Sequence, residues 1–316
     1  ETNKNLDPEV FYHATACLRN LSCAKQSNRQ AMRNCRGLID SLGSYVQDCV
    51  AAERPDDKSV ENCVCVLHNL SFQLENEAPA LFSRISALAG TISRANASAE
   101  TGPIGCFSQQ SSKVQDHFDY PVMEEQHPKG AGWLFHSKTM QSYLSLLRSS
   151  QREDTLEACC GALQNLTANQ GIVSRVMSQS IVQKLNGLPE ISPLLQSSNP
   201  SLQKTAVALV GNLAKNQRLQ SIMARQTLPE LVGILSSWTK EGTESDDTLA
   251  MACQTSHSLL MKEPELGKCL LKYSSLTGIV LSLVRLFPKA SKAAGVLLYS
   301  LWSEKDIQSF LKKVRI

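Results

Sequence analysis

One stretch of this chain recurs in varied form from one end to the other: CCGALQNLT, from Cys159 to Thr167. If Asn165 is taken as the reference, Asn or Ser occupies the matching position elsewhere in the chain. These residues are Asn20, Asn69, Asn212, Ser258 and Ser300. The successive spacings are 49, 96, 47, 46 and 42 residues, and 96 is two periods of 48. A repeat of this length predicts a solenoid of stacked units, with one unit that lacks the motif.

The positions around this reference also repeat. Small residues stand six positions before it, and leucine stands one position after it. The small residues are Ala14, Cys63, Cys159, Ala206, Ala252 and Ala294, and the leucines are Leu21, Leu70, Leu166, Leu213, Leu259 and Leu301. Small side chains let neighbouring helices approach, and leucines fill a shared core. These positions therefore predict a stack of long helices around one continuous core.

Each repeat is expected to contain a short, a medium and a long helix. The first long helix begins at Asp7-Pro8, because Asp is a favoured cap and Pro a favoured first residue. Gly37 separates the short helix from the medium one in the following repeat. Asp57 or Ser59 can then cap the next long helix, which runs through Asn69.

The same order of helices is predicted downstream. The expected helices are 142–147, 155–167, 172–185, 188–195, 202–214, 219–224, 228–238, 247–261, 266–273, 276–287 and 290–302. Pro189 and Pro229 occupy one position in two of them. We expect both prolines in a first helical turn, where a missing N–H removes no helical hydrogen bond.

A long insert interrupts this order. Residues 82–132 are rich in Ser, Gln, Ala and Gly and are expected to replace the first helix of one repeat. Segments longer than about 15 residues without secondary structure are uncommon in compact domains, so we expect the insert to be partly disordered and to bend the stack. Its end contains Trp133 beside several glycines, which is expected to anchor the insert on the solenoid. Repeats are thus predicted over 1–81, the first one partial, and over 133–306, with a truncated helix over 307–316.

Composition argues against several classes of function. Hydrophobic residues make up 42% of the 316 residues and the net charge is +3, which is too small for a strong nucleic-acid field. The eleven cysteines lack zinc-site spacing and are interpreted as buried packing residues in a reducing compartment, with no metal or cofactor. No apolar run approaches the roughly 20 residues that span a membrane. Neither a nucleophile elbow nor a phosphate loop is found, so no enzyme is predicted.

The ends of the long helices resemble a known family. LRNLS at Leu18–Ser22, LHNLS at Leu67–Ser71 and LQNLT at Leu163–Thr167 resemble armadillo repeats. The more specific resemblance is to the plakophilins, desmosomal relatives of the catenin that binds the cadherin juxtamembrane segment. It rests on Asp56–Ser71, the long insert, Pro128-Lys129-Gly130 with Gly132-Trp133-Leu134, and Leu156–Thr167 in this order. The resemblance covers the whole chain.

The resemblance implies an all-α, right-handed armadillo-repeat superhelix: the C-terminal half of a nine-repeat domain, bent at an insert between the fifth and sixth repeats. It also implies a monomeric cell-adhesion scaffold that links desmosomal cadherins and desmoplakin to keratin filaments, mostly through an N-terminal head outside this chain. The implied locations are the desmosome, the cytoplasm and the nucleus. Two alternatives stay open: regulation of RNA or translation, and binding of classical cadherin juxtamembrane tails. Ser258 and Ser300 depart from the family's Asn.

The candidate site is the row of Asn residues on the long helices. Asn20, Asn69, Asn165 and Asn212 carry amides that can hold an extended peptide by its backbone. Alternatively, each amide bonds to its own or a neighbouring helix and only stabilises the fold. Cations near the row could favour an acidic peptide, or they could simply form a solvated face; they are Arg19, Lys204, Lys215 and Lys292. Because Ser replaces Asn in the last two repeats, a peptide is expected to lie on the first half of the row.

Overall fold

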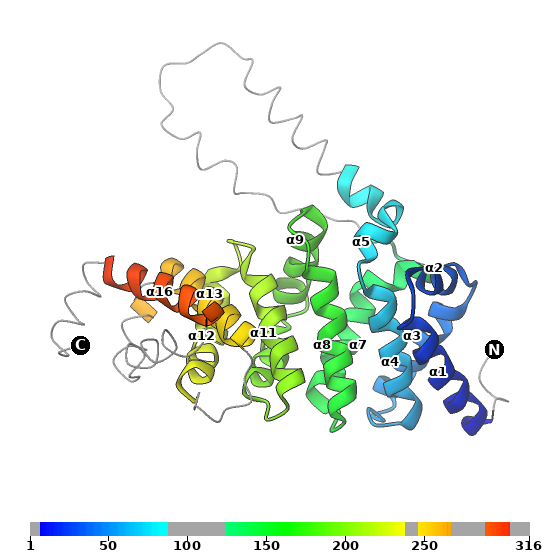
Figure 1. The fold of residues 1–316 in the computed structure, drawn as a ribbon. Coiled ribbons are helices and arrows are strands. Elements are labelled where there is room, and N and C mark those ends of the chain that lie inside the picture. Colours follow the sequence, from blue (N-terminus) through cyan, green and yellow to red (C-terminus); the bar gives the residue numbers. More distant parts are fainter. Residues whose placement is uncertain (1–6, 88–123, 238–245, 264, 267–287, 304–316) are drawn as a thin grey trace, which may run out of the picture.

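The computed structural model describes residues 7–87, 124–237, 246–263, 265–266 and 288–303, and within these ranges the chain contains helices and no strand. The helices follow one another in a row from the N-terminal side to the C-terminal side (Figure 1). Residues 267–273 of one predicted helix, the predicted helix 276–287, the segment 307–316 and most of the insert lie outside the described residues. In the part of the chain that is described, no helix is long and apolar enough to span a bilayer.

Before the insert, the elements are α1 (Pro8–Ser22), α2 (Gln26–Asn34), α3 (Leu38–Ala51), α4 (Lys58–Ser71), α5 (Leu74–Glu77) and the 3-10 helix η1 (Pro79–Phe82). After it come η3 (Gly130–Phe135), α7 (Ser137–Ser149), α8 (Glu153–Thr167), α9 (Ile172–Gln179), η4 (Ser180–Lys184), α10 (Leu188–Ile191), η5 (Ser192–Gln196), α11 (Pro200–Ala214), α12 (Gln220–Ser237), α13 (Asp246–Lys262) and α16 (Pro288–Ser303). η3 and η5 are 3-10 helices, whereas η4 is a π-helix.

The predicted signals at helix starts are confirmed. Asp7 caps α1, because its Oδ1 accepts a hydrogen bond from the backbone N–H of Glu9 at 2.8 Å. Asp57 caps α4 by accepting from Ser59 N at 3.1 Å. Gly37 precedes α3 with a φ of +78°, which favours glycine because other residues are strained in this left-handed region.

The long helices α1, α4, α8, α11, α13 and α16 contact one another in chain order. The small residues of the other five helices are fully buried, whereas Ala14 of α1 is exposed: Cys63, Cys159, Ala206, Ala252 and Ala294 have no exposed surface. The leucines Leu70, Leu166, Leu213 and Leu259 are at most 5% exposed. Leu21 is the exception at 52%, because no described helix covers this face of α1. The predicted all-α solenoid of stacked helices is confirmed for the described residues.

Carboxylates also join the starts of successive long helices. Asp56, just before α4, accepts from Gln151 N, just before α8, at 3.2 Å. Asp246 in α13 accepts from the backbone N–H groups of Lys289 and Ala290 in α16 at 3.1 and 2.8 Å. The first N–H groups of a helix have no partner within the helix, so Asp246 satisfies two such groups of α16, whereas Asp56 bonds the chain two residues before α8 begins.

One predicted helix break is wrong. The segments 219–224 and 228–238 were expected to be separate, but α12 is continuous and contains Pro229 in its interior. A proline inside a helix costs about 3 kcal/mol. Met223, Leu228 and Leu231, which flank Pro229 on both sides, are fully buried. We attribute the unbroken helix to this shared apolar face, whose packing offsets the cost of the proline.

The first helix of the repeat that contains the insert is also partly present, contrary to expectation. α5, η1 and the helical residues 83–87 follow α4 directly. Glu77 of α5 pairs with Arg29 and Arg33 of α2, with N–O distances of 2.5 and 2.6 Å. The Glu77 and Arg33 side chains are only 4% and 3% exposed. This buried ion pair holds α5 against the preceding repeat, a contact that local sequence does not reveal.

Candidate peptide groove

The predicted Asn residues point back to the preceding long helix. Asn69 donates through Nδ2 to Ser22 Oγ at 2.9 Å. Asn165 donates to Ser71 Oγ at 3.1 Å and to the backbone oxygen of residue 68 at 3.2 Å. Asn212 in turn donates to the backbone oxygen of residue 164 at 3.3 Å. The Asn row therefore links successive repeats, as one of the two interpretations expected.

This linking role leaves part of each amide available. No described residue donates to Oδ1 of Asn69 or Asn165, and Asn20 on α1 is exposed. A side-chain amide has two donor hydrogens and an acceptor oxygen. Stabilising the stack and contacting a peptide therefore do not exclude each other at these positions.

The first part of the groove, between α1 and α8, contains both signs of charge. A hollow of about 290 Å³ is lined by Arg19 and Asn69, and also by Asp154 and Glu157. Arg19 is already paired, with Glu61 at 2.7 Å and with Asp154 at 3.8 Å. Its positive charge is thus offset by acids on the neighbouring helices.

Glu61 is the centre of this charge network. It pairs with Arg19 of α1 and with Arg152, whose Nη2 lies 2.6 Å from Oε2. Burial alone would raise the pKa of Glu61, but hydrogen bonds from Arg152 and Arg19 outweigh it and lower the pKa below its usual value. The network therefore connects α1, α4 and the start of α8.

The second part of the groove, from α8 to α13, has a different lining. Its hollow of about 660 Å³ is lined by Arg175 and Lys215, and no carboxylate of the described residues lines it. Seven side-chain amides also line it: Asn169, Gln170, Asn212, Asn216, Gln217, Gln220 and Gln254. Amides can bond an extended backbone in either direction, and the two cations favour a negatively charged group nearby.

Lys215 is held in place at the edge of this second part. Its Nζ donates to Asn212 Oδ1 at 2.8 Å and approaches the backbone oxygen of residue 168 at 3.5 Å. Burial lowers the pKa of the Lys215 ammonium, since a desolvated cation is less favourable. An anionic group in the groove would interact with this ammonium in place of the water that burial removes.

The remaining predicted residues lie apart from this hollow. Lys204 is exposed on α11 and Lys292 on α16, and neither lines either part of the groove. Trp133 lies elsewhere, where its indole N–H donates to Asp40 of α3 at 3.2 Å. Gly130, with a φ of +52°, donates its backbone N–H to the same carboxylate at 3.0 Å. Asp40 thus bonds two residues at the end of the insert.

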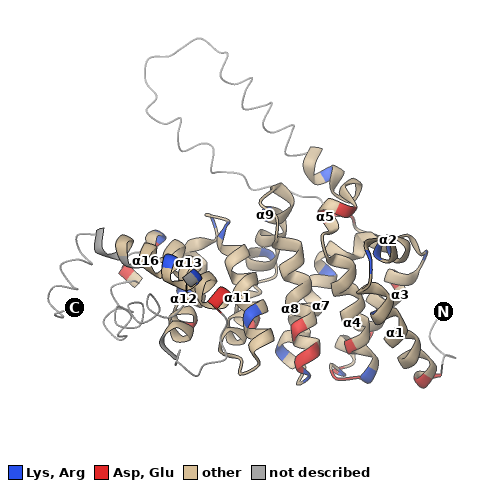
Figure 2. Cartoon of the chain, in the orientation of Figure 1, with Lys and Arg blue, Asp and Glu red and all other residues tan. Residues whose placement is uncertain are grey.

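Charged residues are scattered over the helices, with acids near the start of α8 (Figure 2). The part of the chain that the structure describes has no group of three His, Cys, Asp or Glu side chains placed to hold a metal. Burial raises the pKa of the Cys65 thiol to about 11 and that of the Cys160 thiol to about 12. These thiols stay protonated at neutral pH, which suits packing rather than nucleophilic chemistry.

Sequence reasoning missed Arg175 and most of the amides of the second part, because they come from short helices and loops outside the repeated motif. It also missed the partners of the Asn row. Ser22 and Ser71 both stand two positions after an Asn, as does Thr167. An Asn-Leu-Ser/Thr pattern recurs at the repeat period. This recurrence could have indicated a hydrogen bond between the Asn of one repeat and the Ser or Thr hydroxyl of the preceding repeat.

Comparison with known proteins agrees with this architecture. The family model described as Armadillo/beta-catenin-like repeat matches residues 127–168 and 178–215. The chain is 42% identical to plakophilin-2 of Rattus norvegicus, over 100% of this chain and 39% of the relative. It is 32% identical to plakophilin-4 of Homo sapiens and 33% identical to catenin delta-2 of Homo sapiens, over 96% of this chain and 26% of each relative. The chain thus spans less than half the length of these relatives.

A solved structure supports the fold alone. The chain is similar to the crystal structure of an engineered protein, with a TM-score of 0.53 and 14% sequence identity. The match covers 97% of this chain and 94% of the engineered protein. Because its identity is low, this similarity shows the fold alone and carries no argument about a ligand.

Proposed function

We propose that this chain, an armadillo-repeat region of the plakophilin type, is a non-enzymatic adhesion scaffold that holds acidic peptide segments of junction proteins in the second part of its groove. Plakophilin and catenin relatives support the adhesion role. The proposed partners of the whole protein are desmosomal cadherins, desmoplakin and keratin filaments. Its proposed location is the desmosome, with further pools in the cytoplasm and the nucleus.

The lining of the second groove part is the observation that carries this proposal. Arg175 and Lys215 line a hollow together with seven side-chain amides, and none of the described residues that line it carries a carboxylate. In the first part, by contrast, Asp154 and Glu157 would repel an acidic ligand. We therefore place the peptide on the second half of the described groove, whereas the sequence had favoured the first half.

A peptide titration tests this proposal. We would compare extended peptides that differ only in Glu or Gln at alternate positions, using isothermal titration calorimetry at low and physiological salt. The Glu peptide should bind more tightly, and its affinity should fall as salt rises, because exposed charges are screened. Replacing both cations in a variant R175Q/K215Q should weaken binding of the Glu peptide about tenfold, or roughly 1.4 kcal/mol.

The matched control removes two cations elsewhere. Arg225 of α12 and Lys262 of α13 are exposed and line neither part of the groove. The variant R225Q/K262Q has the same net charge as R175Q/K215Q and should bind the Glu peptide like the unmodified chain. Equal weakening in both variants would mean that only net charge matters and would overturn the assignment of the site.

A cell experiment tests the adhesion role separately. The chain fused to a fluorescent protein should concentrate at cell borders in epithelial cells if the groove contributes to recruitment. The R175Q/K215Q variant should be less enriched there, and R225Q/K262Q should be unaffected. Uniform staining of the unmodified fusion would argue that recruitment does not use this chain.

A further inference from the structure

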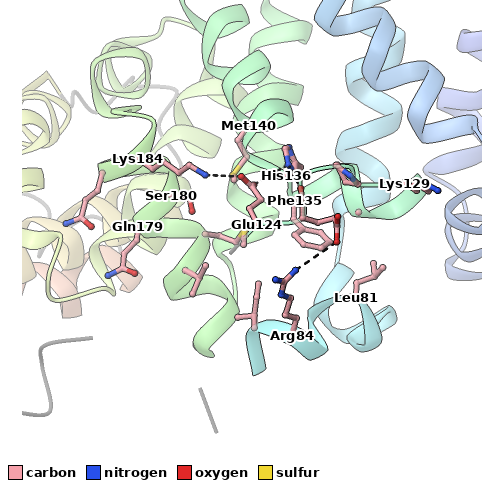
Figure 3. A pocket seen from close by; sticks show the side chains of 17 residues that line it. Leu81, Arg84, Glu124, Lys129, Phe135, His136, Met140, Gln179, Ser180 and Lys184 are labelled. Carbon is pink, nitrogen blue, oxygen red and sulfur yellow. Dashed lines mark hydrogen bonds and ion pairs between the residues drawn. The ribbon is translucent and has the colours of Figure 1, made fainter. Parts of the chain in front are cut away.

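A second concave site lies at the base of the insert, away from the groove. It has a volume of about 670 Å³ and lies between the two ends of the insert and the helices α9 and η4 (Figure 3). It shares no lining residue with either part of the groove. Cavities of roughly 300–1,000 Å³ are typical of sites for small ligands.

The floor of this pocket is apolar. Met140, Val176 and Met177 line it and are at most 4% exposed, and Ile85 is 5% exposed. Phe135 lines it as well, with its ring 4.6 Å from that of the buried Phe82. Methionine side chains are flexible and adapt to ligands of irregular shape. The floor therefore suits a hydrocarbon chain.

The mouth of the pocket has an excess of positive charge. Lys184 pairs with Glu124 at 2.9 Å, and Arg84 lies 4.0 Å from Glu125. Figure 3 shows these two cations reaching the pocket from different helical segments. Lys129 also lines the mouth and is exposed, and no carboxylate of the described residues pairs with it. One positive charge is thus left for a ligand.

The wall opposite the insert is a π-helical turn. Ser180 and Gln183, both in η4, line the pocket, and the described part of the chain offers their side chains no hydrogen-bond partner. π-helical turns are rare and frequently occur at functional sites. The hydroxyl and the amide can bond the polar end of a ligand that enters the mouth.

From this combination we infer that the insert-base pocket binds a single-chain amphiphile with an anionic head, such as a fatty acid. The hydrocarbon chain lies on the apolar floor formed by Met140, Val176 and Met177. The carboxylate lies at the mouth, where Lys129 supplies the opposite charge and η4 supplies hydrogen-bond donors. This ligand differs from the acidic peptide of the groove in both chemistry and location.

Three amphiphiles with the same chain test this inference. Dodecanoate, dodecanol and dodecyltrimethylammonium would be titrated into the full chain below their micelle concentrations, with binding measured by calorimetry. Dodecanoate should bind most tightly, with a single site per chain, and the cationic amphiphile most weakly. Equal binding of all three would show detergent-like adsorption and would overturn the proposed site.

Two variants locate the binding. Lys129→Gln should weaken dodecanoate about threefold and leave dodecanol unchanged, since a partly exposed charge contributes modestly. Ser180→Trp should fill the pocket and abolish binding of both, with circular dichroism and thermal melting confirming that the variant is folded. Lys138→Gln, on the exposed side of α7 and outside the lining, is the matched control and should bind like the unmodified chain. Unchanged dodecanoate binding in Lys129→Gln and Ser180→Trp would overturn the inference.

Discussion

The two parts of the groove are built from the same repeated helices but differ in how their charged side chains are paired. In the first part, Arg19 is paired with Glu61 and Asp154, so its charge is satisfied within the protein. In the second part, Arg175 and Lys215 line a hollow with amides, and the part of the chain that the structure describes contributes no acid to this lining. Charged side chains in the first part thus pair with one another across helices, whereas no ion pair joins Arg175 or Lys215 to a described carboxylate. Substitutions in the two parts should therefore affect different measurements.

The largest effect on folding is expected at Glu77, on the N-terminal side of the stack. Glu77→Gln removes the carboxylate that neutralises Arg29 and Arg33, which are 11% and 3% exposed. Breaking a buried ion pair leaves a charge without a partner, and we expect a loss of about 3 kcal/mol in the free energy of unfolding. Urea denaturation would measure it. Glu53→Gln, at an exposed loop position, is the control, and an equal loss in both would contradict the role of the buried network.

The next effect depends on pH and involves His68 of α4. Burial lowers the pKa of His68 to about 4, while the unfolded chain has a histidine pKa of about 6.5. The unfolded state therefore binds the proton first, and stability that is fully present above pH 6.5 is lost as the pH falls toward 4. Between pH 7 and pH 5 the loss should be about 2 kcal/mol. His68→Gln should flatten this dependence, whereas His13→Gln, at an exposed position, should not.

A smaller effect is expected from the Asn row itself. Asn165→Ala removes two hydrogen bonds to the preceding repeat and should destabilise the chain by about 1 kcal/mol. Asn20→Ala removes an exposed side chain and should change stability by less than about 0.5 kcal/mol. Chemical denaturation of both variants compares them directly. If Asn165→Ala were as stable as Asn20→Ala, the linking role of the row would be wrong.

The smallest effect on folding should come from the second part. Arg175 is exposed on α9, and Arg175→Gln should change the free energy of unfolding by no more than about 0.5 kcal/mol. The same variant should nevertheless bind the acidic peptide more weakly. Paired melting and titration experiments on this variant would show the contrast with Glu77→Gln. A large loss of stability would mean that Arg175 belongs to a structural network like that of Arg19.

The repeated core could be predicted from sequence because its pattern is local and periodic. The positions of Cys159 and Leu166 are filled by a small residue and a leucine in each long helix. This repeated spacing alone indicates a stack of helices. The continuous helix through Pro229 could not be predicted, since it depends on burial against other helices. The same holds for α5, which Glu77 attaches to arginines 44 and 48 residues earlier in the chain.

The candidate site was only partly accessible from sequence. The Asn residues could be found from their period, but the direction of each amide bond depends on which hydroxyl or carbonyl lies opposite. Lys215 could be found because it stands three positions after Asn212, close to the motif. Arg175 could not, because it belongs to a short helix whose place beside the groove is set by packing between repeats.

The carboxylates at the starts of the long helices have a further consequence. Asp56 lies before α4 but bonds to the chain at the start of α8, and Asp246 in α13 does the same for α16. In both cases the earlier repeat supplies the acid and the later repeat receives it. Loss of an earlier repeat, by proteolysis or by pulling, would remove this carboxylate from the start of the next long helix, whereas loss of a later repeat would not. Unravelling of this stack should therefore be easier from its N-terminal side than from its C-terminal side.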